Sequence, residues 1–259
     1  MRKTTLALLA LALTAPLAVA PASATILLSE GFSYANGNLV PNGGWANYSG
    51  AVTDIQIATG RAAGFGPNAN DDHRLFAAQP ATSTTYACFE VTIPAVAGAP
   101  KPIYFFELKD GGAANLVSRL YVVPITGGWT FAISHSTTSA TAGVTPWSAT
   151  TLAYDKRYYI VVNYNPVAKS STLWVNPVNE FSPSVTNSNS TIGALAVSGV
   201  GLRQSATAAT LPASPSYAGT ADWGFSVDNL GVGTTFADAC FQVTPAKSST
   251  WGQIKVLYR

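Results

Sequence analysis

The sequence YYIVVNY at residues 158–164, followed by NPVAKSS at 165–171 and TLWVNP at 172–177, decides the fold class of this chain. Apolar side chains alternate in both runs, and the polar segment between them contains proline and serine. Strict alternation is typical of β-strands, so the stretch predicts a β-hairpin. Both faces of this hairpin carry large apolar groups. We therefore expect it to be covered on both sides or to curl around a groove.

The rest of the chain repeats this pattern of short alternating runs separated by turn residues, and no long stretch has apolar residues at helical spacing. The pattern predicts an all-β, two-sheet antiparallel sandwich of about eleven strands, with five or six in each sheet. The expected strands are residues 26–28, 51–57, 74–76, 85–93, 103–108, 116–123, 129–134, 158–164, 172–175, 196–203 and 225–232. Residues 134–151, 179–191 and 204–220 are expected to be long polar loops.

The first 24 residues have the order of a secretory signal peptide. Arg2 and Lys3 form a basic start, residues 6–19 an apolar segment, and Ala22, Ser23 and Ala24 a small-residue cleavage site. An uncleaved membrane anchor is the alternative, but the apolar run is interrupted by a proline and is shorter than the roughly 20 residues of a membrane span. We therefore expect a secreted, extracellular or cell-surface bacterial protein of about 235 residues after cleavage, which is ordinary for one sandwich domain at residues 25–244.

The charge of the mature chain excludes some classes of partner. The full chain has 14 basic and 12 acidic residues. Because Arg2 and Lys3 leave with the signal peptide, the mature chain is expected to have equal numbers of each. A neutral chain with 10% charged residues has no electrostatic footprint for nucleic acid or anionic membranes. Neutral polysaccharide is the expected partner, and other surface proteins are the alternative.

Several short motifs, in their order along the chain, resemble one family. Residues 30–34 (EGFSY), followed by Gly44-Trp45, are similar to an opening strand and loop. Residues 158–164 and 172–177 follow, and FSVDNLGVG at 225–233 with Asp238 resembles a closing strand. Together they resemble the concanavalin A-like (laminin G-type) jelly-roll domains of secreted bacterial proteins. The resemblance implies a jelly-roll sandwich whose closing strand pairs beside the first, and a family that mostly binds glycans or builds surface structures.

The two cysteines occur in similar contexts. Cys88 and Cys240 are each followed by phenylalanine and lie in or beside an expected strand. Since the chain is expected to be exported, we favour a Cys88–Cys240 disulfide. Two buried free thiols are the alternative. Both interpretations are structural rather than catalytic.

No catalytic pattern is evident, and we expect no enzyme activity. Glycosidases of the resembled fold use two carboxylates in a Glu-x-Asp-x-x-Glu pattern, which this chain lacks. Glu107 and Asp110 are set on opposite faces of a strand by their odd spacing, and Glu107 is expected to pair with Arg or Lys. There is no Gly-x-Ser-x-Gly segment, and His135 lies in a Ser/Thr-rich stretch. A glycoside hydrolase or lyase is the least favoured hypothesis.

We expect no cofactor, with calcium as the one candidate metal. Asn68, Asn70, Asp71 and Asp72 follow a Gly-Pro turn, with His73 beside them. Hard oxygen ligands of this kind can hold calcium, which makes Asp71 and Asp72 the candidate ligands. Asx-rich loops also simply cap turns. Zinc is excluded because the histidines and cysteines have no ligand spacing.

Aromatic side chains are the candidates for glycan binding, because sugar rings present apolar C–H faces. Trp174 alternates with Leu173 and Val175 and is expected to share a concave face with other residues of the hairpin. For each aromatic residue, packing in the core or under a loop is the alternative. The candidate glycan-binding residues are Trp174, Tyr159, Tyr164, Asn176, Trp129 and Trp147.

The sequence therefore predicts an exported, non-catalytic glycan-binding sandwich. The alternative is a structural or adhesive surface protein that acts through protein–protein assembly. Residues 245–259, a polar linker followed by an apolar, basic-ended segment, form a tail that resembles sorting or attachment segments of secreted surface proteins. The competing interpretation is a final edge element of the sandwich.

Overall fold

The computed structural model describes residues 25–50, 53–65, 70–136, 143–148, 150–205 and 219–240. The predicted signal peptide at 1–24 and the predicted tail at 245–259 lie outside these ranges. Within them, no helix is long and apolar enough to cross a membrane.

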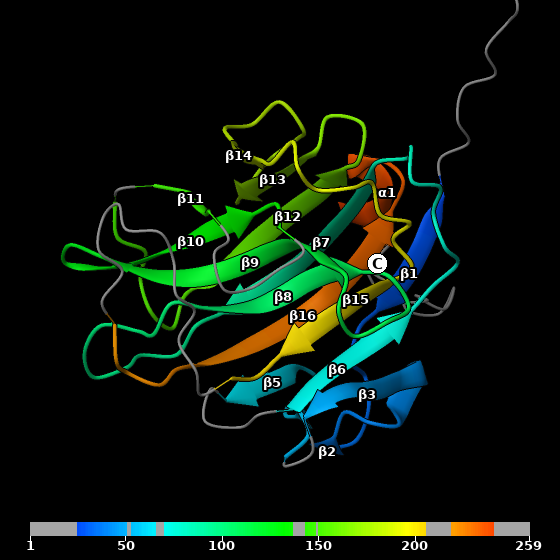
Figure 1. Ribbon diagram of the computed structural model, residues 1–259. Helices are drawn as coiled ribbons and strands as arrows, with labels where there is room; N and C mark the ends of the chain where they lie inside the picture. Colours follow the sequence, from blue (N-terminus) through cyan, green and yellow to red (C-terminus); the bar gives the residue numbers. More distant parts are fainter. Residues whose placement is uncertain are drawn as a thin grey trace, which may run out of the picture.

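Two antiparallel sheets stack face to face, as predicted (Figure 1). The nine-stranded sheet has the order β14 (Val185–Ser188), β13 (Ser170–Val175), β12 (Arg157–Asn165), β7 (Thr85–Thr92), β16 (Gly224–Gly233), β5 (Ala62–Phe65), β4 (Gln56–Ile57) and β2 (Gly37–Asn38), and β1 (Ile26–Glu30) also pairs with β16. The seven-stranded sheet has the order β11 (Thr145–Pro146), β10 (Gly128–Ser134), β9 (Leu116–Ile125), β8 (Ile103–Lys109), β15 (Gly199–Arg203), β6 (Asn70–Leu75) and β3 (Trp45–Gly50). A 3-10 turn, η1 (Asn42–Gly44), precedes β3, and a short helix, α1 (Phe236–Cys240), follows β16.

The predicted hairpin is β12 paired with β13. Val162 lies opposite Leu173 and Val161 opposite Trp174. Ile160 and Val162 point between the two sheets, whereas Val161 and Trp174 belong to a second apolar cluster on the outer face of the nine-stranded sheet. The hairpin is therefore covered on both sides, as its sequence predicts.

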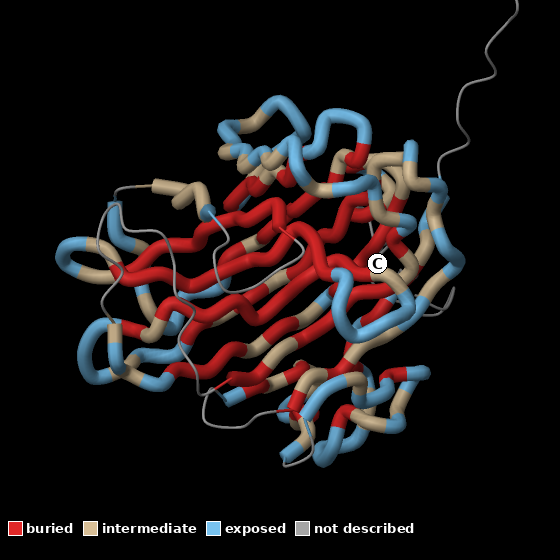
Figure 2. The backbone as a smooth tube through the Cα atoms, in the orientation of Figure 1, coloured by how far each residue is buried: buried red, intermediate tan, exposed pale blue. Residues whose placement is uncertain are grey.

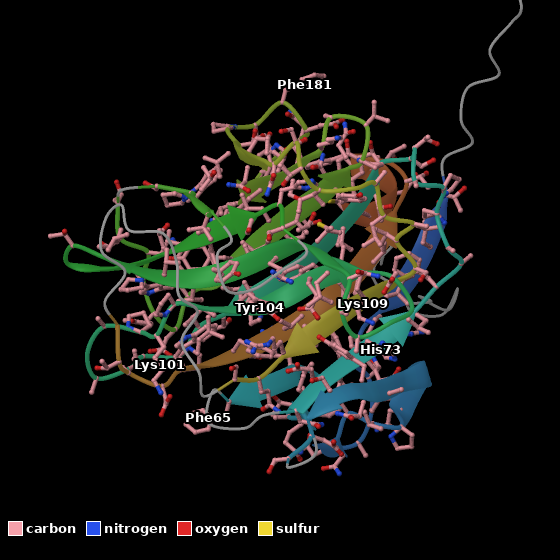
Figure 3. The ribbon with its side chains drawn as sticks, in the orientation of Figure 1. Phe65, His73, Lys101, Tyr104, Lys109 and Phe181 are labelled. Carbon is pink, nitrogen blue, oxygen red and sulfur yellow. The ribbon has the colours of Figure 1, made fainter. Side chains whose placement is uncertain are left out.

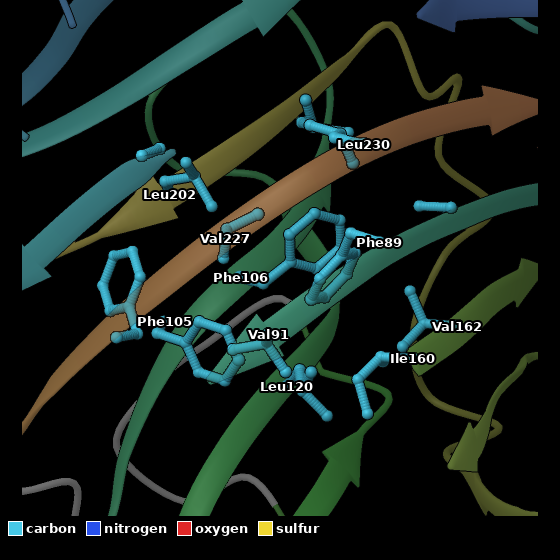
Figure 4. Packing of buried hydrophobic residues seen from close by; sticks show 14 of the residues in the cluster. Phe89, Val91, Phe105, Phe106, Leu120, Ile160, Val162, Leu202, Val227 and Leu230 are labelled. Atoms are coloured by element: carbon cyan, nitrogen blue, oxygen red, sulfur yellow. The ribbon is translucent and has the colours of Figure 1, made fainter. Parts of the chain in front are cut away.

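The main core lies between the sheets, where the central strands are buried along most of their length (Figure 2). Phe89 of β7 packs against Phe106 of β8, with ring centroids 4.5 Å apart (Figure 4). Phe105 packs edge-on against Phe89 from the same strand as Phe106. Full burial of side chains of this size stabilises the fold by about 1.5–3 kcal/mol each.

The ends of the described chain meet in the nine-stranded sheet. Strand β1 pairs antiparallel with β16, and Glu30 lies opposite Leu230. This is the closure that the opening and closing motifs imply. It protects an edge of the sheet that would otherwise present unpaired backbone groups.

The sheets have nine and seven strands rather than the expected five or six each, and β2, β5 and β11 are among the strands that the sequence did not predict. Three further polar segments also differ from the sequence prediction. Residues 70–75 form β6 rather than an Asx-rich loop, because Asn70 and Asp72 on one face are buried and satisfied by hydrogen bonds. Strand β3 occupies residues that were not expected to be extended. Strand β14 lies inside the predicted 179–191 loop. Polar composition concealed all three, because strand pairing satisfies polar backbone whatever the side chains are.

Candidate functional site

The predicted aromatic face of the hairpin lies beneath α1. Trp174 is 4% exposed, its ring centroid is 5.6 Å from that of Phe236, and its Nε1 donates to the carbonyl of Glu180 at 3.1 Å. Tyr159 lies on the same face, and its hydroxyl donates to the carbonyl of Cys240 at 2.9 Å. The structure thus brings these two predicted residues together, but it buries Trp174, so a sugar ring cannot stack on it in this conformation.

The other predicted glycan-binding residues lie elsewhere. Tyr164 and Trp129 point into the main core and are 1% and 0% exposed. Trp147 is half-buried against that core. Asn176 is exposed, and its Oδ1 accepts a hydrogen bond from the backbone N–H of Tyr159 at 2.8 Å. The predicted set therefore does not form one binding surface.

The two cysteines lie near each other under α1. Cys88 is buried on β7 and Cys240 is half-buried at the last residue of α1, and both are free thiols in the structure. Burial is the main cause that raises the pKa of the Cys88 thiol, and the hydrogen bond between the two thiols and the charge of Cys240 add to the effect. The predicted disulfide is thus not formed here, although the two side chains interact, and the pairing stays a prediction.

The two predicted calcium ligands point to opposite faces of β6. Asp72 is fully buried, and its carboxylate accepts hydrogen bonds from Asn70 Nδ2 and from the backbone N–H of Ile55. Asp71 faces the other way, where its Oδ2 is 3.7 Å from Arg203 Nε. The two carboxylates do not share one ligand sphere. Within the described ranges, no group of three or more His, Cys, Asp and Glu side chains could hold a metal ion.

A different set of residues gathers on the outer face of the seven-stranded sheet. Figure 3 shows Tyr104, Lys109 and His73 on this face. They come from neighbouring strands of that sheet, and on β8 and β15 the intervening side chains Leu108 and Leu202 lie in the main core. We call this set the polar cluster: Tyr48, Asp71, His73, Tyr104, Glu107, Lys109, Arg119 and Arg203.

A hydrogen bond that passes over two intervening strands lies at the centre of the polar cluster. The hydroxyl of Tyr48 on β3 donates to Glu107 Oε1 on β8. The bond passes over Gly201 of β15, which lies opposite both His73 and Glu107. A Cβ at position 201 would be 2.0 Å from Glu107 Oε1 and 3.1 Å from the Tyr48 hydroxyl. Only glycine leaves room for this contact.

Glu107 is fully buried and keeps an unused acceptor. Its Oε2 has no hydrogen-bond partner among the described residues. Burial raises the pKa of this carboxyl, and the Tyr48 hydrogen bond and the charges of Arg203, Arg119 and Lys109 oppose the effect. A buried acceptor without a partner is costly unless something else supplies a donor.

Lys109 and His73 form the second part of the polar cluster. The Lys109 ammonium is 2.9 Å from His73 Nδ1 and 4.4 Å from the centroid of the Tyr48 ring, and it also donates to the carbonyl of Asp110 at 3.1 Å. A charged ammonium can only donate, so Nδ1 of His73 accepts and Nε2 carries the ring proton. Burial and the charge of Lys109 lower the pKa of His73, which keeps the ring neutral.

Arginine side chains bound the other end of the polar cluster. The Arg203 guanidinium carbon lies 4.3 Å from the centroid of the Tyr104 ring, and that of Arg119 lies 5.1 Å from the same centroid. Burial is the main cause that raises the pKa of Tyr104 to about 12 and of Asp71 to about 7. Perturbed groups concentrated on one face are typical of functional sites.

A small pocket adjoins this end of the polar cluster. Arg203 belongs to both, and Ile103, Trp223 and Phe225 supply apolar walls. Its interior has room for about one water molecule. The pocket alone therefore accommodates only part of a ligand.

The sequence prediction missed most of this cluster. Glu107 was expected to pair with a basic residue, and it does lie among Lys109, Arg119 and Arg203, but none of these forms an ion pair with it in the described part of the chain. His73 was assigned to a loop. The available signal was the alternation of polar residues within apolar strands, at Glu107 and Lys109 in β8 and at Gly201 and Arg203 in β15.

Comparisons with known proteins give a fold rather than a family. No protein-family model matches the chain, and no curated protein matches it. Among solved structures, a sialidase matches 81% of this chain with a TM-score of 0.50 and 12% identity. A carbohydrate esterase from a Shiga toxin-encoding bacteriophage matches 82% with a TM-score of 0.49 and 14% identity, and lectin I-B4 from Griffonia simplicifolia matches 79% with 0.46 and 10%.

The extent of these matches differs between the structures. This chain spans 19% of the sialidase's length, 99% of the esterase's and 98% of the lectin's. At such identities, structural similarity carries information on the fold alone. With the two antiparallel sheets and the β1–β16 closure, the chain is a two-sheet antiparallel jelly-roll sandwich.

Proposed function

We propose that this protein is an exported, non-catalytic module that binds saccharides at a bacterial cell surface or in the extracellular matrix, and that it binds them at the polar cluster. The observation that carries the proposal is the buried, unused acceptor of Glu107, held in the polar cluster on the outer face of the seven-stranded sheet. The signal-peptide pattern supports export, and the laminin G-type resemblance supports a binding role.

The chemistry of the polar cluster suits sugar hydroxyls, which both donate and accept hydrogen bonds. Glu107 Oε2 is an acceptor, and Nε2 of neutral His73 is a donor. The rings of Tyr48 and Tyr104 add apolar surface beside these polar groups. A few placed polar groups beside aromatic rings are the usual composition of a small-ligand site.

A ligand can reach the polar cluster only through those of its side chains that are partly exposed to solvent. Tyr48, Asp71, His73 and Arg203 keep partial exposure, whereas Glu107 and Lys109 are buried. A ligand approaching from solvent therefore meets Tyr48, His73 and Arg203 first. The acceptor of Glu107 is then reached only when the ligand displaces whatever covers it.

A glycan array on the mature protein tests the proposal, with Gly201→Ala as the discriminating variant. The added methyl group would collide with Glu107 Oε1, so we expect Gly201→Ala to weaken binding to the array's best ligand by tenfold or more. Gly111→Ala is the matched control, because a Cβ at this position would lie 3.8 Å from its nearest neighbour, Ser198 Oγ. Equal binding by wild type and Gly201→Ala, or no binding by the wild type to any glycan, would contradict the proposal.

The non-catalytic part of the proposal has its own readout. Glycoside cleavage usually needs two carboxyl groups flanking the bond, and Asp71, the other carboxyl of the polar cluster, is ion-paired with Arg203. We expect no release of reducing sugar or unsaturated product from bound polysaccharide. Turnover that Glu107→Gln abolishes would overturn this part.

A further inference from the structure

Lys109 is a buried cation without a carboxylate partner. It is 0% exposed, yet none of the ion pairs in the described part of the chain includes it. All twelve acidic residues lie in the described ranges. By contrast, Lys101, at the other end of the sandwich in Figure 3, is 2.6 Å from Asp222 Oδ1.

The groups in direct contact with the Lys109 ammonium are polar but neutral, and the charges of Glu107 and Asp110 act on it from farther away. The contacting groups are His73 Nδ1, the carbonyl of Asp110 and the face of the Tyr48 ring. A buried charge is costly unless it is paired. The three neutral partners compensate for part of that cost. An anion placed against the Lys109 ammonium would compensate for more of it.

Glu107 lies on the same strand as Lys109, and its charge acts on Lys109, but the two side chains form no ion pair. The two side chains leave β8 on the same face two residues apart, about 7 Å along the strand. Glu107 Oε1 is taken by Tyr48, and Oε2 stays unpaired rather than bonding to Lys109. One position therefore favours an anionic group, and the adjacent position favours a hydroxyl donor.

We propose that the saccharide bound at the polar cluster carries a ring carboxylate, with the carboxylate against Lys109 and a neighbouring hydroxyl donating to Glu107 Oε2. This inference rests on the proposed function. It replaces the neutral polysaccharide expected from the net charge of the chain with an acidic saccharide. The net charge averages over the whole molecule, whereas a ligand responds to the charges on the face that it contacts. Uronates and sialic acids both have this chemistry.

Matched pairs of ligands test the inference on the mature protein. The probes are galacturonate, glucuronate and mannuronate trimers and sialyllactose, each as the free acid and as its methyl ester, which removes the charge and keeps the sugar. We expect at least one acid to bind about tenfold tighter than its own ester in titration calorimetry. Added NaCl should weaken binding of that acid and leave binding of the ester nearly unchanged. The uronate and sialyl arms show which source of the carboxylate is recognised.

Lys109→Met is the discriminating variant, and Lys101→Met is the control. We expect Lys109→Met to remove the preference for the acid, and Lys101→Met to keep it. If Lys109→Met does not fold, as seen by thermal unfolding, the acid–ester ratio and the salt dependence of the wild type decide the outcome.

Failure of this inference can be distinguished from failure of the proposed function. Esters or neutral glycans that bind as tightly as acids would overturn the carboxylate assignment and leave saccharide binding intact. Absence of binding to every acid, ester and neutral glycan would overturn both.

Discussion

Gly201 is the residue on which the geometry of the polar cluster depends. It lies between His73 and Glu107, and the absence of its side chain lets Tyr48 reach across β6 and β15. From sequence alone, such a glycine is expected to destabilise the strand. Its role follows only from the strand order, which places β15 between β6 and β8. Strand order depends on contacts between distant segments, so local sequence patterns could not predict it.

Asp71 gives a pH-dependent prediction. Burial, reinforced by the charge of Glu107 and opposed by Arg203, raises its pKa to about 7, whereas an unfolded aspartate has a pKa of about 3.9. Between these values the folded chain holds a proton that the unfolded chain releases, so the contribution of Asp71 to stability falls as pH rises from about 4 to about 7. Asn at this position cannot ionise. We therefore expect the melting temperature of Asp71→Asn, relative to wild type, to rise with pH across this window.

Thermal unfolding of both proteins at several pH values checks this prediction. Other titrating groups, including His73 and His135, are present in both proteins, so their effects largely cancel in the difference. A difference in melting temperature that stays constant from pH 4 to pH 8 would show that Asp71 ionises as an exposed carboxyl does.

At the scale of elements, the hairpin and the long apolar strands were predictable, because alternation records burial directly. Residues 85–92, 116–125 and 157–165 are strands close to their expected bounds. The orientation of Trp174 relative to Leu173 and Val175 was also correct. What covers Trp174 was not predictable. Helix α1 is distant in sequence and only five residues long, too short to leave a clear periodic signal.

Trp174 should behave as a residue that anchors α1 to the sheet. It contacts Phe236 of α1 and Tyr86 of β7, so truncation removes packing on two elements. We expect Trp174→Ala to lower the free energy of unfolding by about 3–5 kcal/mol. Chemical denaturation measures this loss. Phe181→Ala is the control, because Phe181 is 95% exposed, and a change within about 0.5 kcal/mol is expected there.

A different result for these two variants would contradict the anchoring role of Trp174. If Trp174→Ala keeps the stability of the wild type and loses saccharide binding, the tryptophan is a ligand contact and α1 moves away from it. The sequence-based assignment of Trp174 to a glycan site would then be correct, and the assignment of the polar cluster would be wrong.

At the scale of the whole molecule, the two sheets have different outer faces. The outer face of the nine-stranded sheet carries an apolar cluster covered by α1. The outer face of the seven-stranded sheet carries the polar cluster, with cations, carboxyls and aromatic rings in contact (Figure 3). The all-β sandwich was predictable from composition and alternation. The candidate functional face was not predictable, because both outer faces have the same period-two pattern and only tertiary contacts distinguish them.

Nuclear magnetic resonance of the histidine side chains tests the central claim most directly, because the chain has only two histidines. His73 lies in the polar cluster, whereas His135 is buried elsewhere, stacked on Tyr164 with ring centroids 5.6 Å apart. During titration with the tightest ligand from the glycan array, we expect the ring resonances of His73 to shift with the same dissociation constant as calorimetry gives, and those of His135 to stay in place. Calorimetric binding that leaves the His73 resonances unchanged would contradict the account.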